Sequence, residues 1–331
     1  MDVRPGLDPA VAEVRRAVRG ALETVPERGT VIVALSGGAD SLALASAVAF
    51  EAPKRGVTAI SVTVDHGLQD GSAEVAARAA ATAEALGLPA RVVRVVVRDG
   101  AGPEAAARDA RYGALDAVAR EAGAAAILVA HTLDDQAETV LLGLARGSGT
   151  ASLQGMAPVS ERDDGCVILR PLLEVRRTTT QAACAAERLA PWADPHNTDP
   201  RYARVRVRER VLPVLERELG PGVAEALART ASQLREDAEA FAEMIDEMIE
   251  DVVEHAEAGI SLSVGALAAN PAALRHRLIR HVVAAEFGQS LTRSQTLDVA
   301  RLVTGWRGQG PIDLPGCRAA RVSGRIEFTA R

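Results

Sequence analysis

Short apolar runs alternate with longer Ala- and Leu-rich stretches over the first 145 residues of the chain. The short runs are rich in β-branched residues and predict buried strands, whereas the longer stretches have the composition of helices. The predicted strands cover residues 31–35, 57–64, 91–97 and 126–130. The predicted helices cover residues 8–25, 42–50, 72–87, 103–122 and 134–145. These repeated strand–helix units predict an α/β fold, with a doubly wound parallel sheet and helices on both faces.

The regular alternation ends after residue 145. Residues 147–200 contain many glycines and prolines, and we expect helices over residues 177–190 and 202–219. The tripeptide Gly220-Pro221-Gly222 then predicts a domain boundary. We therefore expect an N-terminal catalytic domain over residues 1–220 and a smaller C-terminal domain over residues 221–331.

The C-terminal domain is expected to begin with a long charged helix over residues 223–257. A smaller α/β region follows from Ile260, and the Ser323-Gly324 dipeptide between two apolar–polar segments predicts a closing hairpin.

Composition indicates an ordinary globular protein, because 48% of the 331 residues are apolar and 25% are charged. The net charge of −6 argues against a chain coated in positive charge, although a local basic surface remains compatible with it. Three widely separated cysteines indicate neither a disulfide framework nor a zinc ribbon. No signal peptide or membrane span is expected, so the sequence predicts a cytoplasmic protein without a membrane partner.

The loop after the first predicted strand has the composition of a phosphate cradle. It reads Ser36-Gly37-Gly38-Ala39-Asp40-Ser41 and leads directly into the next helix. Glycines let backbone N–H groups approach an anion, the helix N-terminus adds partial positive charge, and serine hydroxyls can donate to phosphate oxygens. The pattern is neither a Walker A loop nor a dinucleotide fingerprint. Asp40 has two interpretations that do not exclude each other, a Mg²⁺ ligand and a helix cap.

Polar residues also follow two other predicted strands. Asp65 and His66 come after the second strand, and His131 comes after the fourth. Asp134 and Glu138 then lie four residues apart and share one helix face, where they would repel each other unless a cation lies between them. The alternative is that Asp134 or Asp135 simply caps this helix, and His131 on its own is as consistent with a structural role as with catalysis.

Arginines recur at helical spacing in the region after residue 200. Arg201, Arg204 and Arg208 would share a helix face and could contact phosphate groups. Pairing of this face with Glu209 and Glu216 in solvent is the alternative, and the sequence does not decide between the two.

Two levels of resemblance follow from these motifs. The Ser-Gly-Gly-x-Asp-Ser pattern after a strand resembles the pyrophosphate loop of the N-type ATP pyrophosphatases. Four blocks in order resemble the tRNA(Ile)-lysidine synthase family: Ser36–Ser41, Val64–Leu68, His131–Gly149 and Asp194–Asn197 with the arginines after it. His196 and Val205 depart from the family pattern, so its usual Arg-Asn pair is not carried over.

The resemblance implies an ATP-dependent ligase that attaches L-lysine to C2 of the first anticodon cytidine in a CAU-anticodon tRNA(Ile). The reaction would proceed through an adenylated tRNA, and the lysidine product would change codon reading from AUG to AUA and charging from methionine to isoleucine. ATP is the implied co-substrate and Mg²⁺ the implied metal. The C-terminal domain is the expected site of further tRNA contact, and a homodimer is left open.

The resemblance also implies residue roles. It implies that ATP binds at the loop and two residues near it, Ser36, Gly37, Gly38, Ala39, Asp40, Ser41, Asp65 and His66, with Mg²⁺ at Asp40. The reacting groups would lie near His131, and lysine would bind at Asp134, Asp135 and Glu138. The tRNA would contact Arg201, Arg204 and Arg208. A tRNA thiolase with the same ATP loop and a nucleotide-binding regulator without catalysis are the alternative functions.

Overall fold

The computed structural model describes residues 6–67, 71–96, 103–147, 149–162, 166–194, 198–256 and 259–331. The chain forms two compact units, Met1–Arg235 and Glu236–Arg331. The division falls inside the long helix α9 (Val223–Val252), so the Gly220-Pro221-Gly222 turn belongs to the first unit. Assignment of separate roles to residues 1–220 and 221–331 stays a prediction.

The first unit is built on a mixed sheet in the order β3-β2-β1-β4-β6-β5. Its strands are β1 (Thr30–Ala34), β2 (Thr58–Asp65), β3 (Ala90–Arg94), β4 (Ala126–Leu128), β5 (Val159–Glu161) and β6 (Val167–Leu169). All neighbouring strands are parallel except β5, which pairs antiparallel with β6. The predicted α/β class and the first four strands are confirmed, whereas the short strands β5 and β6 were not predicted.

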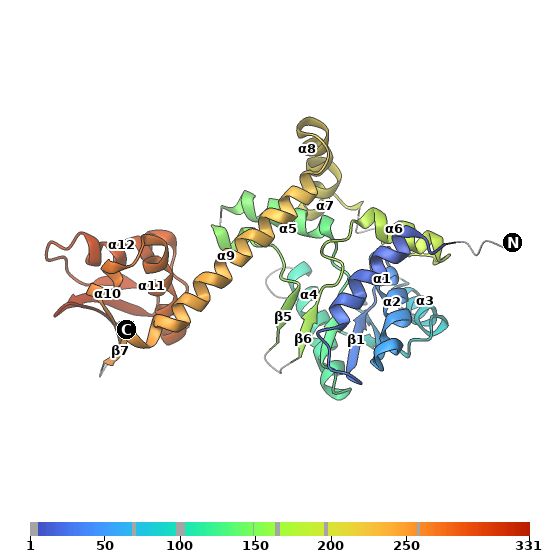
Figure 1. Ribbon diagram of the computed structural model, residues 1–331, viewed down its shortest axis with the longest axis horizontal. Coiled ribbons are helices and arrows are strands. Elements are labelled where there is room, and N and C mark those ends of the chain that lie inside the picture. The colour runs from blue at the N-terminus through green and yellow to red at the C-terminus, as the bar shows by residue number, and fades with distance from the viewer. Residues whose placement is uncertain are drawn as a thin grey trace. The chain divides into compact units, whose positions relative to one another are not determined.

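Helices fill the connections of this sheet (Figure 1). They are α1 (Pro9–Leu22), α2 (Ala39–Glu51), α3 (Ser72–Ala85), α4 (Pro103–Glu121), α5 (Leu133–Arg146), α6 (Arg177–Ala186), α7 (Ala203–Arg206) and α8 (Leu212–Leu219). The helix predicted over residues 202–219 is interrupted by a π-helical turn, Val207–Val211, between α7 and α8. Short 3₁₀ turns follow α2 at Ala52–Arg55 and α5 at Thr150–Leu153.

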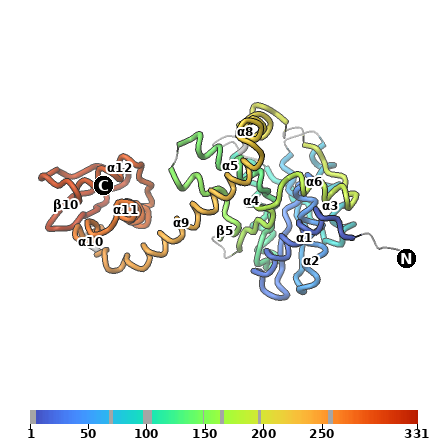
Figure 2. The backbone as a smooth tube through the Cα atoms, turned by 45° about the horizontal axis from the view of Figure 1, so that its top comes forward, coloured from blue at the N-terminus to red at the C-terminus, as the bar shows by residue number. Residues whose placement is uncertain are grey.

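Alternation along β1 divides the core between the two faces of the sheet. Val31 and Val33 pack with α1, α2 and α6 on one face, while Ile32 packs with the buried side of α4 on the other. Successive side chains of a strand point to opposite faces, so a central strand of a covered sheet is apolar throughout. Figure 2 shows α6, far from α1 in sequence, lying beside α1 and α2.

The strand order places the polar loops at one edge of the sheet. The chain runs from β1 to β2 and β3 on one side, and β4 lies on the other side of β1. The order therefore reverses at β1, and ligands of open α/β sheets bind at such a switch point beyond the carboxyl ends of the strands. The loops that begin at Ser36, Asp65 and His131 all leave these ends.

The second unit holds an antiparallel sheet in the order β7-β8-β11-β10-β9. Its elements are β7 (Val253–Ala256), β8 (Gly259–Ser263), α10 (Val264–Ala269), α11 (Ala272–Phe287), α12 (Arg293–Thr304), β9 (Ile312–Leu314), β10 (Cys317–Val322) and β11 (Arg325–Ala330). The predicted hairpin is confirmed as β10 and β11, and both turn residues have positive φ, 45° at Ser323 and 81° at Gly324. Phe328 and Leu262 are fully buried in the core of this unit.

Candidate active site

The predicted phosphate loop forms a tight turn between β1 and α2. Gly37 adopts φ +83°, which glycine reaches without strain. The Ser41 hydroxyl closes the turn, because it accepts from the Ser36 backbone N–H at 3.1 Å and donates to the Gly38 carbonyl at 3.0 Å. Gly38 is the first residue before α2, and no described side chain caps this helix. The positive end of α2 is therefore available to an anion.

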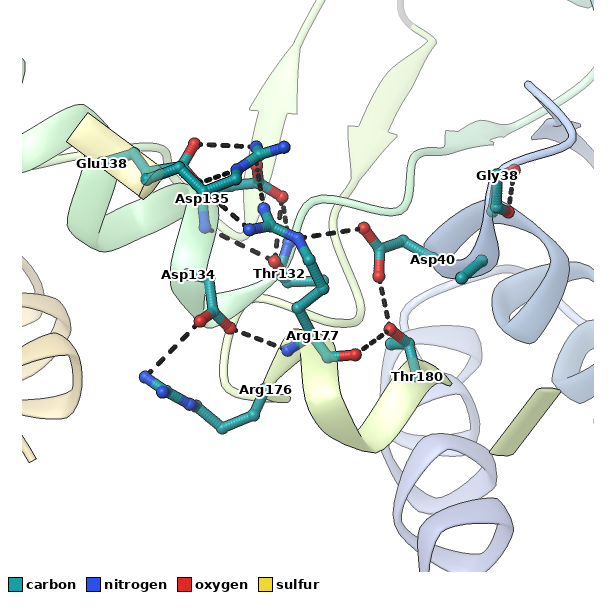
Figure 3. Close-up of polar contacts among 12 residues, drawn as sticks. Gly38, Asp40, Thr132, Asp134, Asp135, Glu138, Arg176, Arg177 and Thr180 are labelled. Atoms are coloured by element: carbon teal, nitrogen blue, oxygen red, sulfur yellow. Dashed lines mark hydrogen bonds and ion pairs between the residues drawn. The ribbon is translucent and has the colours of Figure 1, made fainter. Parts of the chain in front are cut away.

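Asp40 lies in the first turn of α2, and its carboxylate points away from the helix start. It accepts a hydrogen bond from the Thr180 hydroxyl and forms an ion pair with Arg177 Nε at 3.5 Å (Figure 3). The helix-cap interpretation of Asp40 is wrong, because Gly38 occupies the cap position. Burial raises the pKa of Asp40, against the opposing effects of Thr180 and Arg177.

Helix α5 begins with a capping box that satisfies its own N-terminus. The Asp135 carboxylate accepts from the Thr132 backbone N–H at 2.8 Å, and the Asp135 N–H donates back to the Thr132 hydroxyl at 3.4 Å. The capping alternative is thus confirmed for Asp135. Asp134 instead accepts the Arg177 backbone N–H at 2.7 Å, and so serves the first turn of α6.

Glu138 is fully buried, and arginine side chains surround its carboxylate. Arg177 Nη1 lies 3.1 Å from Oε1, Arg204 Nε lies 3.0 Å from Oε2, and Arg208 Nε lies 2.7 Å from Oε1. The sequence predicted a cation beside Asp134 and Glu138. The structure supplies it from the chain itself, since a buried carboxylate needs paired charge and hydrogen bonds.

Arg177 joins all these carboxylates, and sequence reasoning did not find it. Besides Asp40 and Glu138, its guanidinium contacts Asp135 Oδ1 at 2.8 Å. Burial acts to lower the pKa of Arg177, but the surrounding carboxylates, Asp135 first, raise it well above its ordinary value. One local signal existed: basic residues at the start of a helix oppose its dipole, which points to carboxylate partners nearby.

The three arginines predicted to share a face have different environments. Arg204 and Arg208 face Glu138, so their pairing with Glu216 in solvent is wrong. Glu216 instead accepts the backbone N–H groups that open α9, from Gly222, Val223 and Ala224. Arg201 is 81% exposed and pairs with Asp199 at 2.6 Å. Contact of Arg201 with tRNA stays a prediction, and the Pro195–Asn197 part of the fourth block lies outside the described residues.

Asp65 and His66 lie at the carboxyl end of β2 and His131 follows β4, the two strands that flank β1. The Ser72 hydroxyl and the Gly67 N–H lower the pKa of Asp65, so this carboxylate is ionised. Burial, together with Arg111, lowers the pKa of His66. Burial also lowers the pKa of His131 to about 4, with Arg170, Arg204 and Arg108 acting in the same direction. His131 is therefore a neutral imidazole at pH 7.

Known protein families match the part of the chain that holds these loops. A family model described as PP-loop domain matches residues 11–215, and one described as TilS substrate binding domain matches residues 262–326. A tRNA(Ile)-lysidine synthase from Leifsonia xyli is 61% identical over 300 residues, which cover 90% of this chain and 89% of that protein. The chain belongs to the tRNA(Ile)-lysidine synthase family.

Other members of the tRNA(Ile)-lysidine synthase family match over nearly the whole chain. The protein from Streptomyces coelicolor is 48% identical, covering 96% of this chain and 97% of its own length. Among solved structures, the U34-tRNA thiolase NcsA from Methanococcus maripaludis superposes with a TM-score of 0.59. It is 20% identical and covers 69% of this chain and 80% of its own, and this likeness shows the fold alone.

Proposed function

We propose that the protein uses ATP to join L-lysine to C2 of the first anticodon cytidine of a CAU-anticodon tRNA(Ile). The cytosine C2 oxygen would attack the α-phosphorus of ATP, releasing pyrophosphate and forming an adenylated tRNA. A lysine amine would then attack C2, so that a C–N bond forms, the C–O bond breaks and AMP leaves. Positioning and stabilisation of phosphate charge would supply much of the rate.

The observation that carries this proposal is the junction of the phosphate loop and the acidic helix. Asp40 of the loop and Asp135 and Glu138 of α5 meet around Arg177 at the switch point of the sheet. The proposed ATP site and the proposed site for a cationic substrate are therefore adjacent, as a two-step adenylation and amine transfer requires. A regulator without catalysis would not need carboxylates of two elements to be held so close together.

Lysine is proposed to bind along α5. Asp134 lies near the surface, with 17% of its side chain exposed, whereas Glu138 is fully covered by arginines. We propose that Asp134 and Asp135 receive the lysine cation first, and that Glu138 contributes once an arginine moves aside. We also propose that His131 lies near the reacting groups, where its pKa of about 4 suits a neutral hydrogen-bond partner rather than a general base.

Asp40 is the proposed Mg²⁺ contact. Mg²⁺ in nucleotide sites is often held by one or two carboxylates together with substrate phosphates. Asp40 fits this use, because 26% of its side chain is exposed and each oxygen retains a lone pair beyond its contact with Thr180 or Arg177. Bound Mg²⁺ would neutralise phosphate charge beside the open end of α2. The described residues contain no cluster of three or more acidic, histidine or cysteine side chains that would hold a metal without ATP.

The cysteines do not favour the thiolase alternative. Cys166, Cys184 and Cys317 are all buried, and Cys317 belongs to the second unit. Sulfur transfer through paired cysteines or a cluster needs these side chains together.

No helix in the described parts of the chain is both long enough and apolar enough to cross a membrane.

The direct test is incorporation of labelled lysine. Purified protein with ATP, Mg²⁺ and a CAU-anticodon tRNA(Ile) should incorporate lysine and release AMP in equal amounts. The same tRNA with uridine at the first anticodon position should accept none. Failure of lysine incorporation with a tRNA that a known family member modifies would overturn the proposed function.

A further inference from the structure

The first turn of α6 lies between the phosphate loop and the acidic helix. Arg177 opens this turn and Thr180 ends it, and their side chains are 17% exposed and fully buried respectively. Figure 3 shows Arg177 in the middle, with Asp40 on one side and Asp134, Asp135 and Glu138 on the other. Two elements distant in sequence are thus connected through one residue.

We propose that Arg177 is a positioning residue that fixes the phosphate loop relative to the acidic helix by holding Asp40, Asp135 and Glu138 at once. The inference rests on the proposed function and adds a residue through which the ATP site and the amine site are aligned. Adenylation takes place on the C2 oxygen of the cytosine and amine attack at the C2 carbon to which that oxygen is bonded, so misalignment of the two sites by about 1 Å would slow the reaction on the order of 100-fold.

The contacts use the particular shape of an arginine. Nε faces Asp40 at 3.5 Å, Nη2 faces Asp135 at 2.8 Å and Nη1 faces Glu138 at 3.1 Å. A guanidinium presents these nitrogens as a rigid planar fork, whereas a lysine ammonium is a single point charge. Lysine at position 177 would therefore preserve the charge but could not hold three carboxylates in fixed directions.

Neighbouring contacts support the same arrangement. The Thr180 hydroxyl donates to Asp40 and also lies 2.8 Å from the Arg177 carbonyl, which fixes the turn against the loop. One turn later, Cys184 Sγ lies 3.3 Å from the Ala39 carbonyl at the start of α2. On the other side, Asp134 accepts the Arg177 backbone N–H. The backbone and side chain of Arg177 are therefore both anchored.

The experiment compares Arg177→Gln with Arg15→Gln. Arg15 is a matched control, because it is 16% exposed and pairs with Glu187 at 2.7 Å, outside the site. ATP binding is measured by calorimetry in the absence of tRNA and lysine, and kcat and the KM for lysine are measured separately in lysidine formation. Arg177→Gln should weaken ATP binding and lower kcat by about 100-fold, and Arg15→Gln should do neither.

Chemical rescue separates the guanidinium from a general effect on folding. Guanidinium ions at millimolar concentration should restore lysidine formation by Arg177→Ala at least several-fold, and Arg177→Lys should recover less than full activity. An unchanged kcat, or a lowered kcat that guanidinium ions do not rescue, would overturn the positioning role. If the wild type makes no lysidine, the proposed function fails, yet the weaker ATP binding of Arg177→Gln and its recovery with guanidinium ions still test Arg177.

Discussion

Two helices begin at the same edge of the sheet, and their N-termini are built in opposite ways. Helix α2 follows Gly37-Gly38 and has no described side-chain cap, whereas α5 is closed by the Thr132–Asp135 capping box. The open start can receive an anion from outside the chain. The closed start satisfies its own N–H groups and presents carboxylates, which attract cations instead.

Because of this difference, the N-termini of α2 and α5 suit different ligands. A phosphate chain suits α2, while α5 suits an ammonium or guanidinium group, and in this structure the guanidinium of Arg177 already lies between them. One edge of the sheet therefore holds sites of opposite sign at short range. Arg177 couples the two sites electrostatically, because it contacts both Asp40 and Asp135.

Loss of the carboxylate beside the open helix start should have the largest effect. Asp40→Ala should reduce AMP formation at least about 100-fold, because it removes the proposed contact to Mg²⁺ and the partner of Arg177. Asp40→Asn keeps an acceptor for Thr180 but not the charge, and should be equally inactive. Unchanged turnover in an assay of AMP release would mean that the loop has been wrongly assigned.

Neutralisation of Glu138 should come next, with an effect on stability. Glu138→Gln leaves three arginines beside a buried neutral group, and should lower the free energy of unfolding by about 3 kcal/mol in urea denaturation. Glu138→Ala should lose lysine use while partly retaining tRNA adenylation.

Glu51→Gln is the control for Glu138. Glu51 is 2% exposed and pairs with Arg19 and Lys54 away from the site. Its neutralisation should affect stability without a selective loss of lysine use. Equal loss of adenylation and lysine transfer in Glu138→Ala would remove the substrate-specific role of Glu138.

An exchange of caps tests the contrast between the helices directly. Thr132→Ala should destabilise the protein by about 1 kcal/mol without changing ATP affinity. Gly38→Asp, which has room because only the Ser36 hydroxyl lies within 4 Å of an added Cβ, should weaken ATP binding about tenfold by placing a carboxylate at the anion site. Gly38→Ala controls for the added Cβ. ATP affinity that is the same for Gly38→Asp and Gly38→Ala would break the comparison.

His131 should give a pH-dependent stability at acid pH. Its pKa is about 4 in the folded protein and 6.5 ordinarily, so the unfolded chain binds the extra proton first. Stability should therefore fall as the pH drops from about 6.5 and level off near 4. His131→Asn should flatten this dependence in denaturation series, and an unaltered slope would show that other groups cause it.

The smallest expected effect concerns salt. Arg204 and Arg208 are committed to Glu138, which leaves Arg201, Arg206 and Arg210 exposed on this segment. Their contacts with tRNA phosphates should contribute a log–log salt slope of about −2 to tRNA binding. Simultaneous replacement of the three by Gln should reduce the slope by that amount, and an unchanged slope would place tRNA binding elsewhere.

Much of the fold could be predicted from periodicity, but not all of it. β1 to β4 lie in apolar runs between turn signals, and β4, though only three residues long, belongs to the run over residues 126–130. β5 and β6, also of three residues each, lie in the Gly- and Pro-containing region after residue 147, where the pattern is too short to detect. The π-helical turn at Val207–Val211 was also invisible, because the arginine spacing continues through it. In this region Arg204 and Arg208 contact Glu138, and the helix departs locally from α-helical geometry.

The sequence by itself determined which chemical groups lie at the strand ends, because strand and helix signals are local and place each loop at a known edge of the sheet. Only the tertiary structure decided which charges meet. Asp40, Glu138 and Arg177 are separated along the chain by dozens of residues, and their pairing depends on distances in space. A buried carboxylate takes the nearest cation the fold provides, and here that cation is arginine.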